Sequence, residues 1–455
     1  MEKKRENFGS RIALIMALAG SAIGLGNIWR FPYMVGEHGG AAFVVMYVIS
    51  TLLVSLPVFI AEVTIGRRSA CNARSAMATL APGKRFWAAV GYLPIIIPTI
   101  IASYYSVIGG WSLEYFAKAS LATFVESPVD EVQGFFTEFV SSAWGPLAAH
   151  LLFLFLCLAV VAGGVKSGIE KFSKITLPIL FILIVVIAVY SISLPGSGEG
   201  VKYLLKPDFS ELTPRSFAYA MGQSFYSLSL GMGIVITYGS YVRKDENLLT
   251  ISAGTAVSDL LFAILAGLAI MPAVFSAGIE PGAGPGLIFQ SIPYIFATMG
   301  RTAPVLSTII ATLFFLTIVV AAMTSCISLL EVGTAYIVER FKMRRVVACI
   351  ILFVICGFFG ALCSLSFGPL AGVQIAHMGF FDLFDWFSSN ILLLIMALLS
   401  VVFVGFVMRK EDFRDEISNG GGLKIPEPLF NVIYFLIKWV SPVAVTLIFI
   451  TNFLL

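Results

Sequence analysis

The chain has 455 residues, of which 58% are hydrophobic and 12% charged, and its formal net charge is +3. Soluble domains carry about 25% charged residues, so this composition excludes a soluble globular protein. It also gives no reason to expect a nucleic-acid partner. A bilayer core requires about 20 apolar residues per helix, and stretches of that length recur along the chain. The sequence therefore predicts an all-α polytopic membrane protein.

Eleven transmembrane helices are predicted, with two longer loops between them that carry structure of their own. Basic residues gather in the loops on one side of the spans, beginning with Lys3, Lys4 and Arg5. This bias places the N-terminus in the cytoplasm, and an odd number of spans then places the C-terminus outside. The predicted spans are 10–36, 41–66, 88–121, 146–164, 169–193, 214–241, 248–277, 304–339, 344–366, 383–408 and 427–454.

The first span contains the polar, glycine-rich stretch GSAIGLGNIWRFP at residues 20–32. A broken helix in a membrane survives only where it is buried in protein or lines a cavity, because lipid cannot bond the freed backbone groups. Close helix packing through Gly20 and Gly24 is an alternative reading. That reading explains the glycines but not Asn27 and Arg30 beside them, so we interpret the stretch as a functional interruption.

A second interruption is predicted in the sixth span, where SLSLGMGIVITYG occupies residues 227–239. Interrupted helices at corresponding places in two five-span halves indicate a transporter with inverted repeats, whose substrate and ions bind at the breaks. The sequence thus predicts a 5+5 inverted repeat with broken helices 1 and 6. The predicted domains are a transporter core over 1–408, with repeats at about 10–193 and 214–408, and then a cytoplasmic loop with the eleventh helix over 409–455.

The two interrupted segments also carry a family resemblance. ALAGSAIGLGNIWRFPYMVGEHGGAAF resembles the first-helix signature of neurotransmitter:sodium symporters, and GQSFYSLSLGMGIVITYGSYVRKD resembles their sixth helix. The likeness extends from Arg5 to about Asp385. It implies sodium-coupled uptake of an amino acid or amine by a protein of the leucine-transporter type. Short termini and the absence of a twelfth span are typical of prokaryotic members, which places the protein in a prokaryotic plasma membrane.

The resemblance implies a first sodium site between spans one, six and seven. Its expected ligands are the carbonyl of Ala22, the side chains of Asn27 and Ser227, the carboxylate of the substrate, and a residue of span seven. In the stretch AVSDLL, Asp259 fits one helical register and Ser258 the other, and Asp259 is favoured. A carboxylate at mid-membrane costs about 2.5–3.5 kcal/mol by insertion scales, and a sodium ion compensates that charge. The same carboxylate supplies the negative charge that chloride provides in some animal relatives, so chloride is not expected.

A second sodium site is implied between spans one and eight, which makes two sodium ions in all. A hard cation prefers several oxygen ligands, and AAMTSCIS places adjacent hydroxyl groups in an otherwise apolar span. Serine and threonine in membrane helices also commonly bond their own backbone, so the assignment rests on the resemblance. Its expected ligands are Gly20, Ile23, Ala321, Thr324 and Ser325.

The substrate is expected between the two breaks. Tyr105 and the backbone amides of Leu25 and Gly26 are expected to hold a carboxylate. Gly24 leaves room for that carboxylate, where amine-selective relatives have an aspartate. The predicted pocket has no charged residue, which favours apolar L-amino acids, and Met232 is adaptable enough to accept several sizes. The complete set of expected substrate-binding residues is Ala22, Gly24, Leu25, Gly26, Ile101, Tyr105, Tyr226, Ser227, Ser229, Met232, Ser325 and Leu329.

Two gates are implied on either side of this pocket. Outside, Arg30 is expected to pair with Asp385, directly or through water, above a lid formed by Tyr105 and Tyr226. Inside, Arg5 is expected to pair with Glu339, and Tyr241 is expected to brace that pair. Solvated ion pairs contribute only about 0–1 kcal/mol each, which is weak enough for a gate to open and close.

The sequence therefore predicts a sodium-coupled symporter that imports hydrophobic amino acids by alternating access, as a monomer or weak dimer among membrane lipids. A proton-coupled permease of the same fold and a transport-inactive amino-acid sensor are the alternatives. An enzyme is not expected, because no nucleophile and base are assembled. The six cysteines and three histidines show no metal-ligating spacing.

Overall fold

The computed structural model describes residues 8–278 and 287–454. These residues form helices and loops, and they contain no strand beyond an isolated bridge between Ile375 and Met378. In this described part, nine helices are long and apolar enough to cross a membrane, or ten if one bent pair counts as a span. The predicted sixth span is missing from that count because it consists of two helices of 14 and 6 residues. The all-helical membrane architecture is therefore confirmed, whereas the count of eleven spans stays a prediction.

The first five predicted spans correspond to helices in the first half of the chain, several of which contain a π-helical turn. In chain order they are α1 (Arg11–Ala22) with η1 (Gly26–Arg30) and α2 (Phe31–Glu37); α3 (Gly40–Ser50) with η2 (Thr51–Ser55) and α4 (Leu56–Ser69); α7 (Leu93–Ser120); α11 (Trp144–Ala162); and η3 (Val165–Glu170) with α12 (Lys171–Ile192).

The remaining predicted spans follow in the second half. They are α14 (Pro214–Ser227) with α15 (Ile234–Gly239); α16 (Leu248–Ser276); α18 (Pro304–Phe341); α19 (Arg345–Leu365); α20 (Phe380–Phe387) with η6 (Ser388–Leu392), α21 (Leu393–Val402) and η7 (Phe403–Val407); and α23 (Glu427–Phe435) with η8 (Leu436–Val440) and α24 (Ser441–Leu454).

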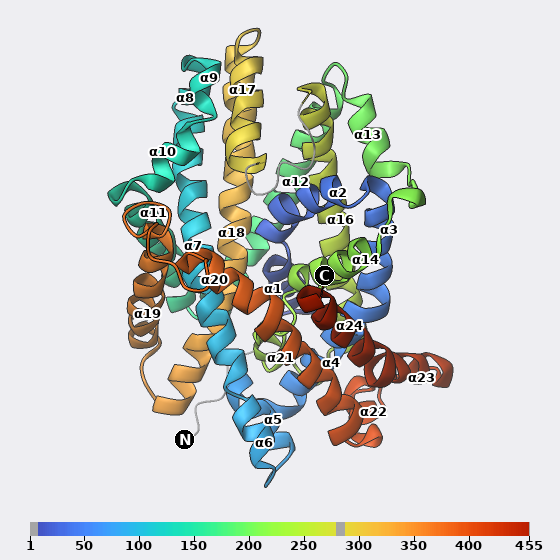
Figure 1. Ribbon diagram of the computed structural model, residues 1–455. Helices are drawn as coiled ribbons and strands as arrows, with labels where there is room; N and C mark the ends of the chain where they lie inside the picture. Colours follow the sequence, from blue (N-terminus) through green and yellow to red (C-terminus); the bar gives the residue numbers. More distant parts are fainter. Residues whose placement is uncertain (1–7, 279–286, 455) are drawn as a thin grey trace.

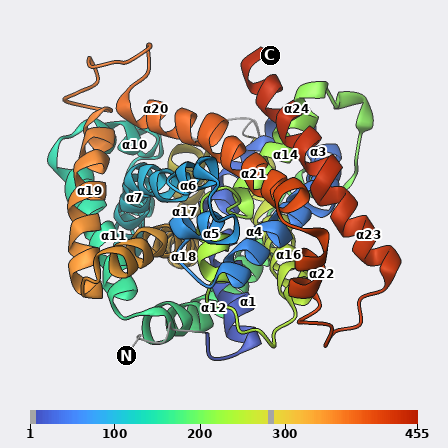
Figure 2. The same ribbon diagram turned by 90° about the horizontal axis from the view of Figure 1, so that it is seen from below.

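Short helices lie in the connections at both ends of the bundle. Figure 1 shows α5, α6 and α22 at the lower end, and α8, α9, α13 and α17 at the upper end. Seen from below, α19 and α11 form one edge of the bundle, and α23 and α24 form the opposite edge (Figure 2). The bounds are α5 (Ala73–Leu80), α6 (Arg85–Val90), α8 (Thr123–Glu126), α9 (Val129–Val132), α10 (Phe135–Ser141), α13 (Gly198–Leu205), η4 (Phe209–Glu211), η5 (Leu287–Ser291), α17 (Ile292–Gly300) and α22 (Lys410–Ile417).

Residues 278–303 form one of the two longer loops that are predicted from the sequence to carry structure of their own. The part of this loop at 279–286 lies outside the described residues. The rest forms η5 and α17, and α17 packs against α18 and α8. Because α8 and α17 lie at the upper end in Figure 1, this piece covers that end of the bundle.

Both predicted helix interruptions are present. In span one, α1 ends at Ala22, the helix resumes at Gly26, and the two parts are bent by 51°. In span six, residues 228–233 separate α14 from α15. Gly231 and Gly233 have φ angles of 72° and 74°, a left-handed conformation that glycine adopts without steric cost. The glycines noted in the sequence are therefore required by the backbone at the second break.

Glycines on both helices allow α15, the second half of span six, to approach span two closely, and Gly66 is the tighter of the two positions, Gly66 and Gly239. A Cβ atom added at Gly66 of α4 would lie 2.1 Å from the carbonyl oxygen of Ile236. At Gly222 of α14, by contrast, an added Cβ meets nothing within 4 Å. The short helix α15 therefore packs directly on the backbone of α4.

We expect Gly66→Ala to destabilise the protein by about 1–3 kcal/mol or more, because the added methyl group forces α15 away from α4. Thermal unfolding of the purified protein in detergent measures this change. Gly222→Ala is the matched control and should leave the melting temperature nearly unchanged. Equal melting temperatures for both variants would contradict the close packing at Gly66.

Candidate functional site

The two breaks lie against one small closed cavity, of about 20 Å³, which has room for about one water molecule. Every residue predicted to bind substrate lines this cavity except Leu25, whose backbone amide contacts the lining residue Tyr105. Ser21 and Ile234 also line it and were not predicted. The lining residues are Ser21, Ala22, Gly24, Gly26, Ile101, Tyr105, Tyr226, Ser227, Ser229, Met232, Ile234, Ser325 and Leu329.

Polar groups gather at the end of the cavity formed by span one. The amide of Leu25 donates to the hydroxyl oxygen of Tyr105 at 3.2 Å. The carbonyl oxygen of Ser21 accepts from Ser229 at 2.9 Å and from Ser325 at 3.1 Å. These bonds satisfy backbone groups that the break releases from the helix, as a membrane interior requires.

Gly24 has no room for a side chain. A Cβ atom at this position would lie 2.2 Å from the hydroxyl oxygen of Ser325 and 2.9 Å from that of Tyr105. The glycine therefore keeps the wall of the cavity open between spans three and eight.

A fully buried carboxylate lies beside the cavity. Asp259 of α16 accepts from the amide of Asn27 at 2.8 Å, and its two oxygens accept from the hydroxyl of Ser227 at 2.8 and 2.9 Å. Ser258 instead donates to the carbonyl of Gly254 at 2.8 Å. Of the two registers left open by the sequence, the structure thus brings Asp259 and not Ser258 to the break.

Tyr47 joins this cluster and was missed by the sequence analysis. Its hydroxyl donates to the second oxygen of Asp259 at 3.1 Å, and its side chain is fully buried. Three donors thus surround one carboxylate, and a charge with such partners is far less costly to bury than an isolated one. Asn27, Ser227 and Asp259 together present several oxygen atoms of the kind that hard cations bind.

A second group of oxygens lies between α1 and α18. The hydroxyl of Thr324 contacts the carbonyl oxygens of Ile23 at 3.2 Å and Ala321 at 2.8 Å. Gly20 lies against the same side chain, since its added Cβ would be 3.7 Å from Thr324. Ser325, which was also expected here, directs its hydroxyl to Ser21 at the cavity instead.

The outer gate differs in part from the prediction. The guanidinium of Arg30 lies 4.9 Å from the ring centre of Tyr226, as a cation–π contact. Within the described residues Arg30 and Asp385 form no direct ion pair, and Asp385 accepts from Ser389 at 3.1 Å. Tyr226 lines both the inner cavity and a second small cavity on the side of Arg30 and Asn390. Tyr226 thus lies between the two cavities, and the lid formed by Tyr105 and Tyr226 stays a prediction.

At the other end, Arg5 lies outside the described residues, so its pairing with Glu339 stays a prediction. Glu339 accepts from the backbone amide and side chain of Asn72 at 3.0 and 2.7 Å. The hydroxyl of Tyr241 donates to the carboxylate of Glu331 at 2.8 Å, and Arg345 pairs with the same carboxylate.

Buried acids were the main omission of the sequence analysis. Glu331 and Glu62 are both fully buried in membrane helices. Glu62 accepts from the amide of Gly231 in the second break at 3.0 Å and from Ser400 at 3.1 Å. A signal was available, because an ionisable residue within an apolar span indicates a functional or structural site.

Comparisons with known proteins identify the family of the chain. A family model, the sodium:neurotransmitter symporter family, matches residues 5–127 and 121–455. The chain belongs to this family. It is 35% identical to the sodium-dependent transporter YhdH of Bacillus subtilis, over 99% of this chain and 98% of that protein. A sodium-dependent transporter of Haemophilus influenzae is 34% identical, over 99% and 98% of the two chains.

Among solved structures, the crystal structure of MhsT in complex with L-phenylalanine superimposes with a TM-score of 0.90. MhsT is 38% identical, and the match covers 99% of this chain and 100% of that one. The chain is therefore a multi-pass, sodium-dependent symporter, and its relatives are transporters rather than enzymes.

Gly24→Ala should abolish binding of a labelled amino acid, because the methyl group displaces Ser325 and Tyr105 from the cavity wall. Scintillation-proximity binding of L-phenylalanine to the purified protein measures this loss. Gly198→Ala, where an added Cβ meets nothing within 4 Å, serves as the control. Normal binding by the Gly24 variant would show that the substrate lies elsewhere.

Proposed function

We propose that the protein imports apolar L-amino acids together with two sodium ions by alternating access. The observation that supports this most directly is the uncharged cavity between two helix breaks, beside the buried carboxylate of Asp259. A cavity of this kind offers backbone groups to a zwitterion and apolar walls to its side chain. The carboxylate next to it offers a binding partner for a cation.

The chemistry of the cavity supports an amino acid rather than an amine. Gly24 leaves the position beside Tyr105 free of any acidic group, so a substrate carboxylate meets the Tyr105 hydroxyl without repulsion. Ile101, Met232 and Leu329 supply apolar surface for the side chain. The MhsT structure contains L-phenylalanine, an apolar amino acid. This supports the proposal of an apolar amino acid as the substrate of the present protein, which is a relative of MhsT.

Sodium would bind at the two oxygen clusters. We assign the first ion to the carbonyl of Ala22 with Asn27, Ser227 and Asp259, and the second to Gly20, Ile23, Ala321, Thr324 and Ser325. At the first site the ion replaces hydrogen-bond donors as the partner of the Asp259 carboxylate. Since this carboxylate already supplies a fixed negative charge, the proposed transport cycle does not use chloride.

The sodium gradient is an adequate energy source for this reaction. Moving one charge through 100 mV yields about 2.3 kcal/mol. A tenfold concentration gradient adds about 1.4 kcal/mol per ion. Two ions therefore supply about 7 kcal/mol, enough for roughly 10⁵-fold accumulation of a zwitterion.

In the proposed cycle, spans one, two, six and seven rock against the remaining helices. Arg30 with Asp385 forms the outer gate, and Arg5 with Glu339 the inner one. The protein would lie in the plasma membrane of a prokaryote with its N-terminus in the cytoplasm and its C-terminus outside, as a monomer or weak dimer.

Uptake of radiolabelled L-phenylalanine and L-leucine into proteoliposomes tests the function directly. We expect accumulation under an inward sodium gradient, none under a potassium gradient, and no change when gluconate replaces chloride. Uptake driven by a pH gradient instead would favour a proton-coupled permease. Sodium-dependent binding without uptake would favour a sensor.

Asp259→Asn should raise the sodium concentration for half-maximal binding about tenfold or more, which corresponds to about 1.4 kcal/mol, because the ion loses its charged partner. Sodium titration of L-phenylalanine binding measures this shift. Ser258→Ala is the neighbouring control, because Ser258 bonds only its own helix. An unchanged sodium dependence in the Asp259 variant would exclude the assigned first site.

A further inference from the structure

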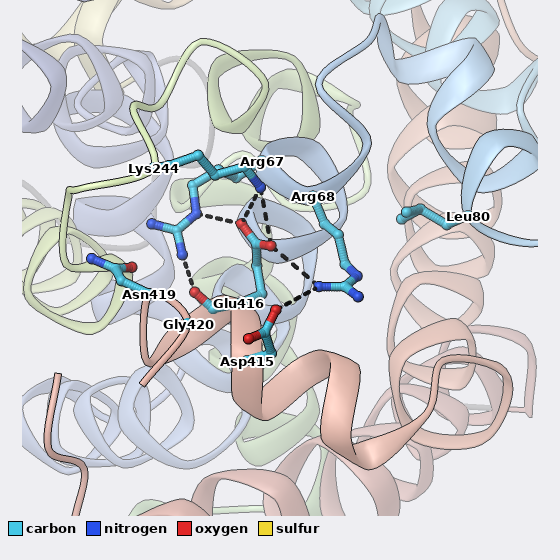
Figure 3. Close-up of a pocket in the computed structure, with 8 residues that line it drawn as sticks. All are labelled: Arg67, Arg68, Leu80, Lys244, Asp415, Glu416, Asn419 and Gly420. Carbon is cyan, nitrogen blue, oxygen red and sulfur yellow. Dashed lines mark hydrogen bonds and ion pairs between the residues drawn. The ribbon is translucent and has the colours of Figure 1, made fainter. Parts of the chain in front are cut away.

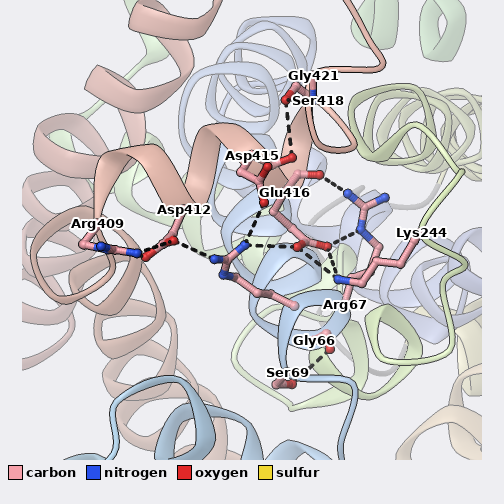
Figure 4. A network of polar contacts seen from close by, with 11 residues as sticks. Gly66, Arg67, Ser69, Lys244, Arg409, Asp412, Asp415, Glu416, Ser418 and Gly421 are labelled. Atoms are coloured by element: carbon pink, nitrogen blue, oxygen red, sulfur yellow. Dashed lines mark hydrogen bonds and ion pairs between the residues drawn. The ribbon is translucent and has the colours of Figure 1, made fainter.

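A charged network outside the transport site joins the short helix α22 to the bundle (Figures 3 and 4). Its centre is Glu416, which lies on α22 between the predicted tenth and eleventh spans. The Glu416 carboxylate accepts from Arg67 at 2.6 Å, from Lys244 at 2.9 and 3.1 Å, and from Arg68 at 3.4 Å. Asp412, one turn earlier on α22, pairs with Arg68 at 2.7 Å.

The contact between Arg67 and Glu416 is buried. The side chain of Arg67 is 1% exposed and that of Glu416 is 5% exposed. Arg67 also donates to the carbonyl of Glu246 at 2.6 Å and to the backbone carbonyl of Glu416. Burial raises the pKa of Glu416, but Lys244 and Arg67 more than offset this effect and hold the pKa below its ordinary value. The pair is therefore charged at neutral pH, and separating it would leave a charge buried without its partner.

The residues of this network come from the ends of four spans. Arg67 lies at the end of span two, and Lys244 and Glu246 lie in the link between spans six and seven. Glu246 also pairs with Arg11, the first residue of α1, at 2.7 Å. These are the four spans that are proposed to rock together.

The links on both sides of α22 are not helical. Before it, Met408 is extended, with φ −74° and ψ 139°. After it, Asn419, Gly420 and Gly421 have φ angles of 52°, 67° and 86°. Neither neighbouring span continues into α22 as a straight helix, although Arg414 of α22 pairs with Glu427 of α23 at 2.6 Å. Because only an extended link joins α22 to span ten, the backbone there leaves α22 free to move with the spans that its charged residues contact.

We propose that α22 acts as a clasp, by which we mean that it binds the inner ends of spans one, two, six and seven through the network centred on Glu416. These spans and α22 then move as one unit. Glu416 is thus a positioning residue for transport, far from the substrate. This inference rests on the proposed function in one respect: it assumes that spans one, two, six and seven move during alternating access.

A ligand site is the other reading of this region, because a cavity of about 460 Å³ lies beside the network. Three cations line it, Arg67, Arg68 and Lys244, but each of them already donates to a carboxylate of α22. The lining therefore favours a fastening between protein segments over a site for an anion.

Distances between spin labels test the clasp in proteoliposomes. Labels are placed on Glu411→Cys of α22, Thr250→Cys of span seven and Arg344→Cys before span nine, all exposed positions, in pairs. Cys71, the one cysteine of the described residues that is not buried, is replaced by serine. Each pair is measured by double electron–electron resonance with sodium and L-phenylalanine, and then with potassium.

We expect the 250–344 and 411–344 distances to shift together between the two conditions, while the 411–250 distance stays constant. A 411–250 distance that changes as much as the 250–344 distance would overturn the proposal. If the 250–344 distance does not change, the result rejects the proposed movement of these spans and not the clasp. The clasp is then tested by the Glu416→Gln variant.

Glu416→Gln removes the charge that holds Arg67, so the narrow 411–250 distribution should be lost in both conditions. Asp415→Asn is the matched control, since the Asp415 side chain is 60% exposed and its carboxylate pairs with Arg68 at 3.4 Å, and its distribution should stay narrow. A narrow distribution in the Glu416 variant would show that this residue does not fasten α22, and would overturn the proposal whether or not the spans move.

Discussion

Two unwound segments lie in the middle of the membrane, and the protein itself must satisfy their backbone groups. Lipid offers no hydrogen-bond partners, so each free amide or carbonyl costs several kcal/mol unless a neighbouring group bonds it. In span one, Gln223 donates to the carbonyl of Gly26 at 2.9 Å, and Thr324 donates to that of Ile23. In span six, Glu62 accepts from the amide of Gly231. The buried polar residues of this protein are arranged around this requirement.

The same requirement explains why substrate and ions can bind where they are proposed to bind. Backbone groups held by side-chain hydroxyls can exchange those hydroxyls for a ligand without losing a bond. Ser227 touches both sides of the site, because it lines the cavity and donates to Asp259. In the proposed function an ion replaces the hydrogen-bond donors of Asp259, and Ser227 is one of these donors, so sodium binding and the cavity wall share this residue. Such a shared contact contributes a coupling free energy between the two sites. Sodium then raises the affinity for substrate by the same factor as substrate raises the affinity for sodium.

The features that the sequence predicted are those with a local signal. Glycines, Asn27 and Arg30 within a hydrophobic run indicated the first break, and the repeated pattern five spans later indicated the second. Asp259 stood out as a charge in an apolar helix. The cavity lining followed from resemblance, and only Leu25 among those residues lies outside it.

What the sequence analysis missed depends on contacts between distant segments. Tyr47 looks like any aromatic residue of a membrane helix, and its role arises only because span two passes Asp259 of span seven. Glu331 carried a signal, but its partners Tyr241 and Arg345 come from other elements. Arg30 and Asp385 were expected to pair directly or through water, and a direct pair depends on side-chain direction. In the described residues no direct pair forms, and the Arg30 guanidinium lies over the Tyr226 ring.

The strength of each charged contact depends on its burial. Weak, solvated contacts suit a gate that opens and closes, and strong, buried contacts suit segments that stay together. A solvated pair contributes about 0–1 kcal/mol, so a gate built from such pairs opens readily. Removing one partner of a buried pair costs about 3–5 kcal/mol. The Arg67–Glu416 contact is of the second kind, with both side chains almost fully buried. A transporter that must pass between two states many times would gain nothing by breaking such a contact in each cycle. Movement is therefore expected at the cation–π contact of the half-buried Arg30 with Tyr226, while the buried network keeps the inner ends of the moving helices together.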